Sequence, residues 1–177
     1  MTDPVAVLDG LRQPDRRSCG ASVVVAARIL TDPSYAVSMT PARFADEALH
    51  AHRRITSPRL GGRLQVPWPR ALGTPPWAVA RELRLLTSVA YAVRPVRLGR
   101  RTWPHIVGAT PTRPVAVFVG DRLLPRHVVL VTDVERDVTR TYEPASGLDL
   151  EVSRQRWGSG DLGLAGWDRP WLVVRPR

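Results

Sequence analysis

Three residue types that together support thiol chemistry occur in this chain in the order cysteine, histidine, acid. Cys19, the only cysteine among 177 residues, opens an apolar run, His127 begins a strongly apolar stretch, and Glu143 stands directly before a proline. A thiolate attacks a carbonyl carbon, an imidazole takes and returns a proton, and a carboxylate orients the imidazole. We therefore interpret these residues as a candidate nucleophile, base and orienting acid.

Cys19 is predicted to lie in the first turn of a buried helix. Between Ala21 and Leu30 only two residues are strongly polar, and the run is longer than a typical buried strand. The Val23 to Val25 triplet favours a strand, which stays an alternative. The unpaired N–H groups and positive dipole end of a helix start favour thiolate over thiol. A free cysteine is also often a small buried hydrophobe, so a purely structural Cys19 is the competing interpretation.

Gln13 lies six positions before Cys19, and the residues between them predict a short loop. Pro14 pushes Gln13 toward an extended conformation. The loop can then fold the Gln13 amide over the helix start, where its NH₂ group and the Cys19 N–H would converge on one oxyanion.

Two other residues compete for the roles of base and acid. His105, beside a proline in a tryptophan-containing turn, is the alternative base. Asp133, six positions along the strand that His127 begins, is the alternative acid. At roughly 3.3 Å per residue it would lie about 20 Å from His127, too far for direct contact.

The first half of the chain is predicted to be helical. A second helix follows the Thr40–Pro41 start and runs to about Arg53. His50 and His52 lie near its end, where we expect them to face solvent or to interact with the helix dipole. From Thr56 to Pro76, proline and glycine predict an irregular loop that is either functional or mobile, and that in a peptidase would border the substrate cleft. A third helix, from the Thr74–Pro75 start to about Ser88, carries a stripe predicted to face the core: Trp77, Ala80, Leu83 and Leu86.

The second half is predicted to be a sheet. Thr102 to Val107 indicates one short helical turn. Valine-rich segments separated by Gly, Asp and Pro indicate strands at Pro114–Val119, Arg126–Asp133, Thr139–Tyr142 and Trp171–Val174. Helices before strands predict an α+β fold with a mainly antiparallel sheet. We expect one domain over residues 1–177, with a helical half at about 11–93 and a sheet half at about 94–177.

On these residues the sequence resembles the papain-like cysteine peptidases, and most closely the bacterial C39-like peptidases. The resemblance rests on the Gln13-to-Cys19 interval, the 108 positions from Cys19 to His127, and the Glu143–Pro144 segment. It implies a papain-like fold in which Gln13 supplies the oxyanion hole, Cys19 the nucleophile, His127 the base and Glu143 the orienting group. Glutamate here replaces the family's usual aspartate or asparagine, and the segment 14–17 has no role in the family pattern.

The function expected from this resemblance is hydrolysis of peptide or amide bonds through an acyl-enzyme intermediate. Deamidation, transglutamination and peptidoglycan amide cleavage use the same groups and stay open. The expected partner is a peptide or protein substrate. No cofactor and no metal are expected, because no His/Cys cluster has the spacing of metal ligands.

The composition keeps a non-catalytic alternative open. The net charge is +10, and all 26 basic residues are arginine. A solvated basic surface is the default interpretation. The alternative is a papain-like binding module whose arginine-rich surface engages an acidic partner protein. Nucleic acid is not expected, because no motif that reads it is present.

Three features that the sequence lacks bear on the cellular compartment of the protein: a disulfide, a membrane span and a signal peptide. A lone cysteine forms no internal disulfide, so nothing in the sequence requires an oxidising compartment. No run reaches 18 apolar residues, so no membrane span is expected. The chain shows no secretory signal pattern. We expect a soluble protein made in the cytoplasm, with export independent of such a signal still open.

Overall fold

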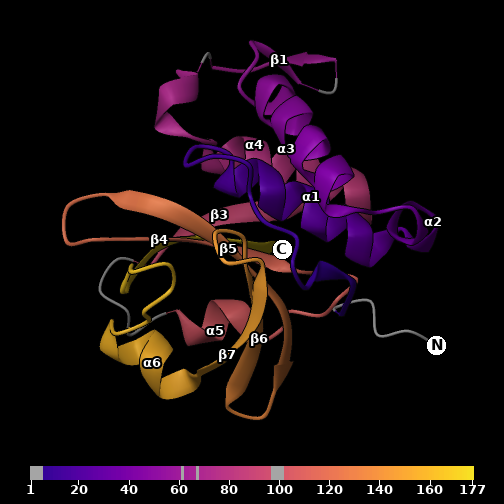
Figure 1. The fold of residues 1–177 in the computed structure, drawn as a ribbon. Coiled ribbons are helices and arrows are strands. Elements are labelled where there is room, and N and C mark those ends of the chain that lie inside the picture. Colours follow the sequence, from indigo (N-terminus) through magenta and orange to yellow (C-terminus); the bar gives the residue numbers. More distant parts are fainter. Residues whose placement is uncertain (1–5, 61, 67, 97–101) are drawn as a thin grey trace.

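The computed structural model describes residues 6–60, 62–66, 68–96 and 102–177. Over these residues the chain forms an α+β fold in three layers (Figure 1). Helices from the first half of the sequence cover one face of a sheet built by the second half, and two short helices cover the other face. The predicted fold class is confirmed.

The helices and strands agree in large part with the predicted segments. The α-helices are α1 (Cys19–Thr31), α2 (Pro33–Val37), α3 (Pro41–Ile55), α4 (Pro76–Thr87), α5 (Trp103–Ile106) and α6 (Arg154–Ser159), with 3₁₀ turns η1 (Ala6–Leu8) and η2 (Arg70–Leu72). The strands are β1 (Arg59–Leu60), β2 (Arg63–Leu64), β3 (Tyr91–Pro95), β4 (Val115–Gly120), β5 (Pro125–Glu135), β6 (Val138–Glu143), β7 (Leu148–Ser153) and β8 (Arg169–Pro176). None of the helices in the described ranges is long and apolar enough to cross a membrane.

The main sheet has six strands in the order β3-β8-β4-β5-β6-β7, and every neighbouring pair is antiparallel. In the β5–β6 register, Leu130 is opposite Tyr142. Because the two strands run in opposite directions, His127 near the start of β5 and Glu143 at the end of β6 lie at the same end of the sheet. The two strands are direct neighbours in the sheet, so Glu143 is within reach of the imidazole.

Successive side chains of the strands point to opposite faces of the sheet, so the hydrophobic core has two parts, one on each face. Along β4, Ala116 and Phe118 face the core shared with α1, α3 and α4, whereas Val115, Val117 and Val119 face the core shared with α5 and α6. Such alternation is what a strand buried on both faces produces.

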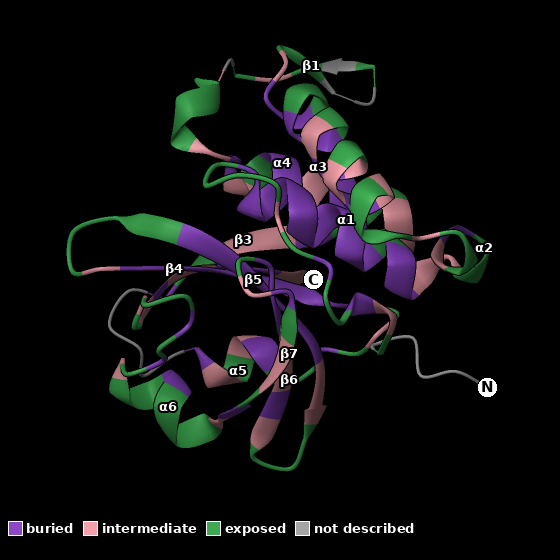
Figure 2. Cartoon of the chain, in the orientation of Figure 1, coloured by how far each residue is buried: buried purple, intermediate pink, exposed green. Residues whose placement is uncertain are grey.

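Helix α1 lies at the centre of the first core. Every residue from Cys19 to Leu30 is buried except Arg28, which agrees with the purple colour of the helix in Figure 2. α1 packs on α3 and α4 on one side and on β5 on the other. An apolar run enclosed on several sides is stable as a helix despite its three valines, so the helix prediction is confirmed over the strand.

Several predicted details are wrong. The short helix α2 after Thr31 is not predicted, and its start is capped by the Asp32 side chain, which accepts the Tyr35 N–H. The cap of α4 is Pro75 rather than Thr74. Strands β3 and β7 and helix α6 were not predicted.

The buried stripe of α4 differs from the predicted one. Ala78, Val79 and Leu83 are buried, whereas Trp77 is 39% exposed. Trp77 instead meets Trp68 edge to face, with ring centroids 5.2 Å apart. The loop before α4 therefore supplies a partner that helical periodicity does not reveal.

His52 is also placed differently from the prediction. It is 7% exposed, whereas His50 is exposed as expected. Burial lowers the pKa of His52, while the neighbouring Asp15 carboxylate opposes this shift. Segments distant in sequence, around Asp15 and Arg70, therefore approach this face of α3.

Candidate active site

His127 and Glu143 form a buried pair at the end of the sheet. The Nε2 atom of His127 lies 2.6 Å from Oε1 of Glu143, and the two residues are 6% and 2% exposed. Nε2 is thereby engaged, which leaves Nδ1 as the ring nitrogen available to Cys19. Cys19 interacts with the His127 side chain from the start of α1 and is itself 5% exposed. The structure thus brings together the three residues that the sequence singled out.

The electrostatics of the pair favour a charged imidazole. Burial alone would lower the pKa of His127, but the interactions with Cys19 and Glu143 outweigh it and raise the pKa to about 9. Burial alone would raise the pKa of Glu143, but the hydrogen bonds from His127 and from its own turn hold it at about 2. An imidazolium between a carboxylate and a sulfur is the charge arrangement that a thiolate–imidazolium pair requires.

Glu143 is fixed by its own turn as well as by the histidine. Its Oε1 accepts the Ala145 N–H at 2.7 Å, and its Oε2 accepts the Ser146 N–H at 2.8 Å. The longer glutamate side chain therefore folds back over the turn that follows β6. Both carboxylate oxygens have partners, so Glu143 has a defined position.

The start of α1 leaves backbone donors beside the cysteine. Ser18 is the N-cap residue and makes no side-chain capping bond within the described part of the chain. The Ser22 N–H donates to the Ser18 carbonyl at 2.7 Å, which is the first bond of the helix ladder. The N–H groups of Cys19 and Gly20 precede that bond and have no acceptor within the helix. They are donors suited to an oxyanion.

The turn before α1 is organised by Asp15, a residue that the sequence interpretation missed. Its Oδ1 accepts the N–H groups of Arg17 at 2.8 Å and Ser18 at 2.9 Å. The Asp15-to-Ser18 spacing of three is typical of such turns and was the available signal. This turn gives a structural role to the segment 14–17, for which the family pattern offered none.

Gln13 is held from both its backbone and its side chain. The backbone N–H donates to the Pro144 carbonyl at 2.7 Å, and Nε2 donates to the Asp15 carbonyl at 2.8 Å. Its Oε1 is buried without a partner in the described residues. One amide hydrogen is therefore used by the loop, and the second is the one that an oxyanion role requires.

The segment that carries Gln13 is hydrogen-bonded to the turn that follows Glu143. Besides the bond to Pro144, the Gly10 N–H donates to the Gly147 carbonyl at 2.8 Å, and Arg12 Nε donates to the Ser146 carbonyl at 2.8 Å. Gly147 has φ +69, and a Cβ there would lie 2.9 Å from the Leu11 carbonyl oxygen, so glycine is needed. The segment with Gln13 and the turn that holds Glu143 therefore fix each other in position.

The rival residues lie elsewhere. His105 belongs to α5, on the other face of the sheet from Cys19, and its charged neighbours are Arg175 and Arg94. Asp133 is opposite Arg140 in the β5–β6 register, away from the end that carries Glu143. Within the described ranges, no group of three or more His, Cys, Asp or Glu residues is arranged to hold a metal ion.

Comparisons with known proteins identify similar folds only. No family model and no curated protein matches the chain. The peptidase domain of Streptococcus ComA, a bifunctional ABC transporter involved in quorum sensing, is similar with a TM-score of 0.44 and 16% identity, covering 94% of this chain and 97% of that one. A double glycine motif protease from an AMS/PCAT transporter, solved with its leader peptide, has a TM-score of 0.47 and 11% identity, covering 94% and 89%.

Proposed function

We propose that this chain is a cysteine-dependent hydrolase that cleaves peptide or amide bonds through an acyl-enzyme intermediate. The observation that carries the proposal is the position of His127, which is bonded to Glu143 at 2.6 Å and whose pKa is raised by its interactions with Cys19 at the start of α1 and with Glu143. In this arrangement the imidazole holds a proton next to a sulfur nucleophile. That is the chemistry of acyl transfer.

The reaction begins with the Cys19 thiolate attacking the carbonyl carbon of the substrate. A C–S bond forms, and the carbonyl electrons move to the oxygen, which accepts hydrogen bonds from the Cys19 N–H and the Gln13 NH₂ group. When the intermediate collapses, the C–N bond breaks and the His127 imidazolium gives its proton to the leaving amine. His127 then takes a proton from water, the hydroxide displaces the sulfur, and the carboxylic acid leaves.

Glu143 positions the base throughout this cycle. Its Oε1 holds Nε2 of His127, which leaves Nδ1 for proton transfer with the sulfur. The carboxylate also stabilises the imidazolium, as the raised pKa of His127 reflects. Because the two backbone N–H groups of its turn hold Glu143 in place, this orientation persists when the imidazole is neutral.

The proposal is tested by incubating the full chain with a defined mixture of peptides and following their masses. Hydrolysis divides one peptide into two fragments that share one added water. Deamidation changes a glutamine to a glutamate without cleavage, and transamidation adds a supplied amine. Cys19→Ala is the control, and each product that the wild type forms should be absent with it. Equal product formation by Cys19→Ala would overturn the proposal.

A second measurement addresses the alternative of a structural cysteine. Iodoacetamide should alkylate Cys19 of the folded protein at acidic pH, because the proposed mechanism requires a thiolate paired with the His127 imidazolium. His127→Ala should slow this alkylation. If Cys19 reacted only after unfolding in denaturant, the cysteine would be structural and no hydrolase would be proposed.

A further inference from the structure

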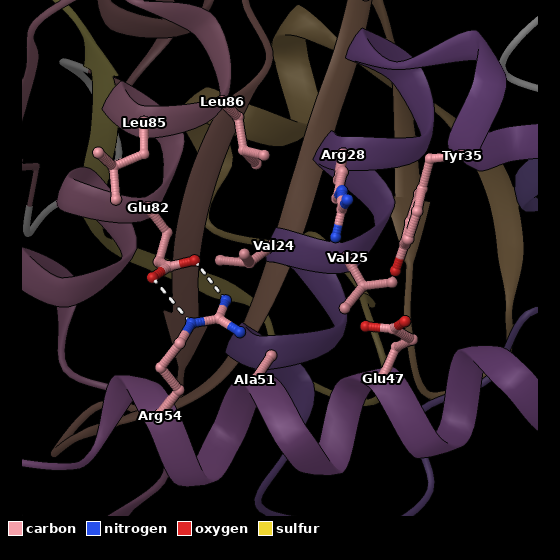
Figure 3. A pocket seen from close by; sticks show the side chains of 10 residues that line it. All are labelled: Val24, Val25, Arg28, Tyr35, Glu47, Ala51, Arg54, Glu82, Leu85 and Leu86. Carbon is pink, nitrogen blue, oxygen red and sulfur yellow. Dashed lines mark hydrogen bonds and ion pairs between the residues drawn. The ribbon is translucent and has the colours of Figure 1, made fainter. Parts of the chain in front are cut away.

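A cavity of about 290 Å³ opens among the helices, apart from the candidate active site (Figure 3). Residues of α1, α2, α3 and α4 line it, and no strand contributes. Arg28, which points into it, is nine residues after Cys19, or about 13 Å along the helix at 1.5 Å per residue. The volume lies at the lower end of the range for ligand pockets, which suits a small molecule.

The cavity contains a buried hydroxyl that lacks a partner. Tyr35 is 6% exposed, and its hydroxyl makes no hydrogen bond with any described residue. The ring lies under the Arg28 guanidinium, 3.9 Å from its centroid, and the hydroxyl points toward the Glu47 carboxylate (Figure 3). Burial and the Glu47 charge raise the pKa of Tyr35 to about 12, so the hydroxyl is neutral. The hydroxyl interacts with the Glu47 carboxylate but makes no hydrogen bond of normal geometry to it, so a donor placed between the two oxygens would bond to both.

Charged side chains of both signs line the cavity, and they lie at different sides of it. Arg54 and the buried Glu82 form a two-bond pair at one side, with Nη2–Oε2 at 2.6 Å and Nε–Oε1 at 3.3 Å. The Nη1 of Arg54 takes no part in that pair. Glu47 extends from α3 at the other side, and its ion pair with Arg43 spans a long 3.9 Å.

This arrangement of positive and negative side chains favours a ligand that carries both charges. A purely cationic ligand would meet two arginines, and a purely anionic ligand would meet two glutamates. A small zwitterion has a complementary partner for each of its charges. Aliphatic side chains of α1 and α4, among them Val24, Val25 and Leu86, supply an apolar wall beside these groups.

We propose that the cavity binds a free α-amino acid with an aliphatic side chain, as the zwitterion. The ammonium group donates to the Glu47 carboxylate and to the Tyr35 hydroxyl oxygen. The carboxylate accepts from Arg28 and from Nη1 of Arg54. The aliphatic side chain packs against the valines of α1. This site is independent of the proposed hydrolase activity.

Isothermal titration calorimetry of the full chain with three probes of similar shape tests the proposal. L-leucine carries both charges, L-leucinamide only the ammonium, and 4-methylpentanoate only the carboxylate. We expect the Kd of leucine to be at least tenfold lower than that of either other probe. Absence of leucine binding at millimolar concentration, or equal binding of leucinamide or 4-methylpentanoate, would overturn the proposal.

Variants localise the binding to the cavity. Tyr35→Phe keeps the ring under Arg28 but removes the hydroxyl, and it should weaken leucine binding at least fivefold. Arg84→Gln changes an exposed arginine of α4 outside the cavity and should leave the Kd unchanged. Cys19→Ala should bind leucine like the wild type, which separates this site from the hydrolase proposal. Undiminished binding by a folded Tyr35→Phe contradicts the site, and if that variant fails to fold, the three wild-type titrations still decide the proposal.

Discussion

Gly20 and Thr74 are in such close contact that no methyl group fits between them. A Cβ added to Gly20 would lie 2.7 Å from the Cβ of Thr74 and 3.0 Å from its Oγ1. Thr74 ends the proline-rich loop, so the contact joins this loop to the first turn of α1. The position of Cys19 therefore depends on a segment more than fifty residues away in the sequence.

Gly20→Ala should destabilise the protein by about 1–3 kcal/mol, because the added methyl group meets an atom attached to backbone and forces a shift. The same shift displaces Cys19, so hydrolysis should decrease as well. Urea unfolding measures the first effect. Gly158→Ala in α6 is the matched control, since a Cβ added to Gly158 would meet no atom within 4 Å and alanine favours a helix. A Gly20→Ala variant as stable as the wild type would show that Thr74 yields without cost.

Glu143→Gln should destabilise the turn after β6 and not only the His127–Glu143 pair. The carboxylate accepts three hydrogen bonds, from His127, Ala145 and Ser146, and a glutamine offers one oxygen and an NH₂ group to the same three donors. One buried donor would then face another, at a cost of about 1–3 kcal/mol. Thermal unfolding of the variant and the wild type at neutral pH measures this difference.

The stabilities of the wild type and of Glu143→Gln can also be compared as a function of pH. The folded-state pKa of Glu143 is lowered from 4.5 to about 2, so the carboxylate stabilises the fold above pH 4.5 and this contribution is lost as the pH falls through 2. The difference in Tm between wild type and Glu143→Gln should therefore shrink as the pH falls below 4.5. A difference that stays constant there would contradict the role of the charged carboxylate.

His127 should lose its proton only in alkaline solution. Its folded-state pKa is raised from 6.5 to about 9, so the stabilisation by the imidazolium is complete below pH 6.5 and is lost as the pH rises through 9. The kcat/KM for an amide substrate should fall over the same alkaline range, because the leaving amine needs the proton. NMR titration of the ring should show a lower pKa in Cys19→Ala, which removes one of the two stabilising neighbours. An unchanged pKa would mean that the sulfur does not act on the ring.

Local patterns in the sequence were sufficient to predict the main elements of the site. The apolar run after Cys19 predicts α1, and the valine-rich segments around His127 and Glu143 predict β5 and β6. These signals work because burial imposes a period of 3.6 on helices and of two on strands. Strand β7 carries the same alternation in Leu148–Ser153 and could have been predicted from it.

Contacts between distant segments could not be predicted in this way. The burial of His52 depends on segments near Asp15 and Arg70, and the need for glycine at position 20 depends on Thr74. Each of these contacts is set by tertiary packing, which residue type and spacing do not specify.

Gln13 provides the sharpest test of the site, because its proposed role is confined to the transition state. Its Nε2 donates one hydrogen to the Asp15 carbonyl at 2.8 Å, which orients the amide and leaves the second hydrogen for an oxyanion. Loss of one oxyanion donor typically lowers kcat by about 10²- to 10³-fold. Gln13→Ala should therefore lower kcat to that extent with little change in KM. Alkylation of Cys19 by iodoacetamide should stay near the wild-type rate, because alkylation forms no oxyanion.

Gln13→Glu is the matched variant for this prediction. It keeps the size of the side chain but replaces the NH₂ donor with an oxygen, so it should be at least as slow as Gln13→Ala. A Gln13 that is only structural would behave differently, because both variants would then lower the Tm and slow alkylation and turnover together. Steady-state kinetics, thermal unfolding and alkylation rates of the same preparations separate the two roles. A normal kcat in a folded Gln13→Ala variant would exclude the oxyanion role and leave the Cys19 and Gly20 N–H groups at the start of α1 as the donors.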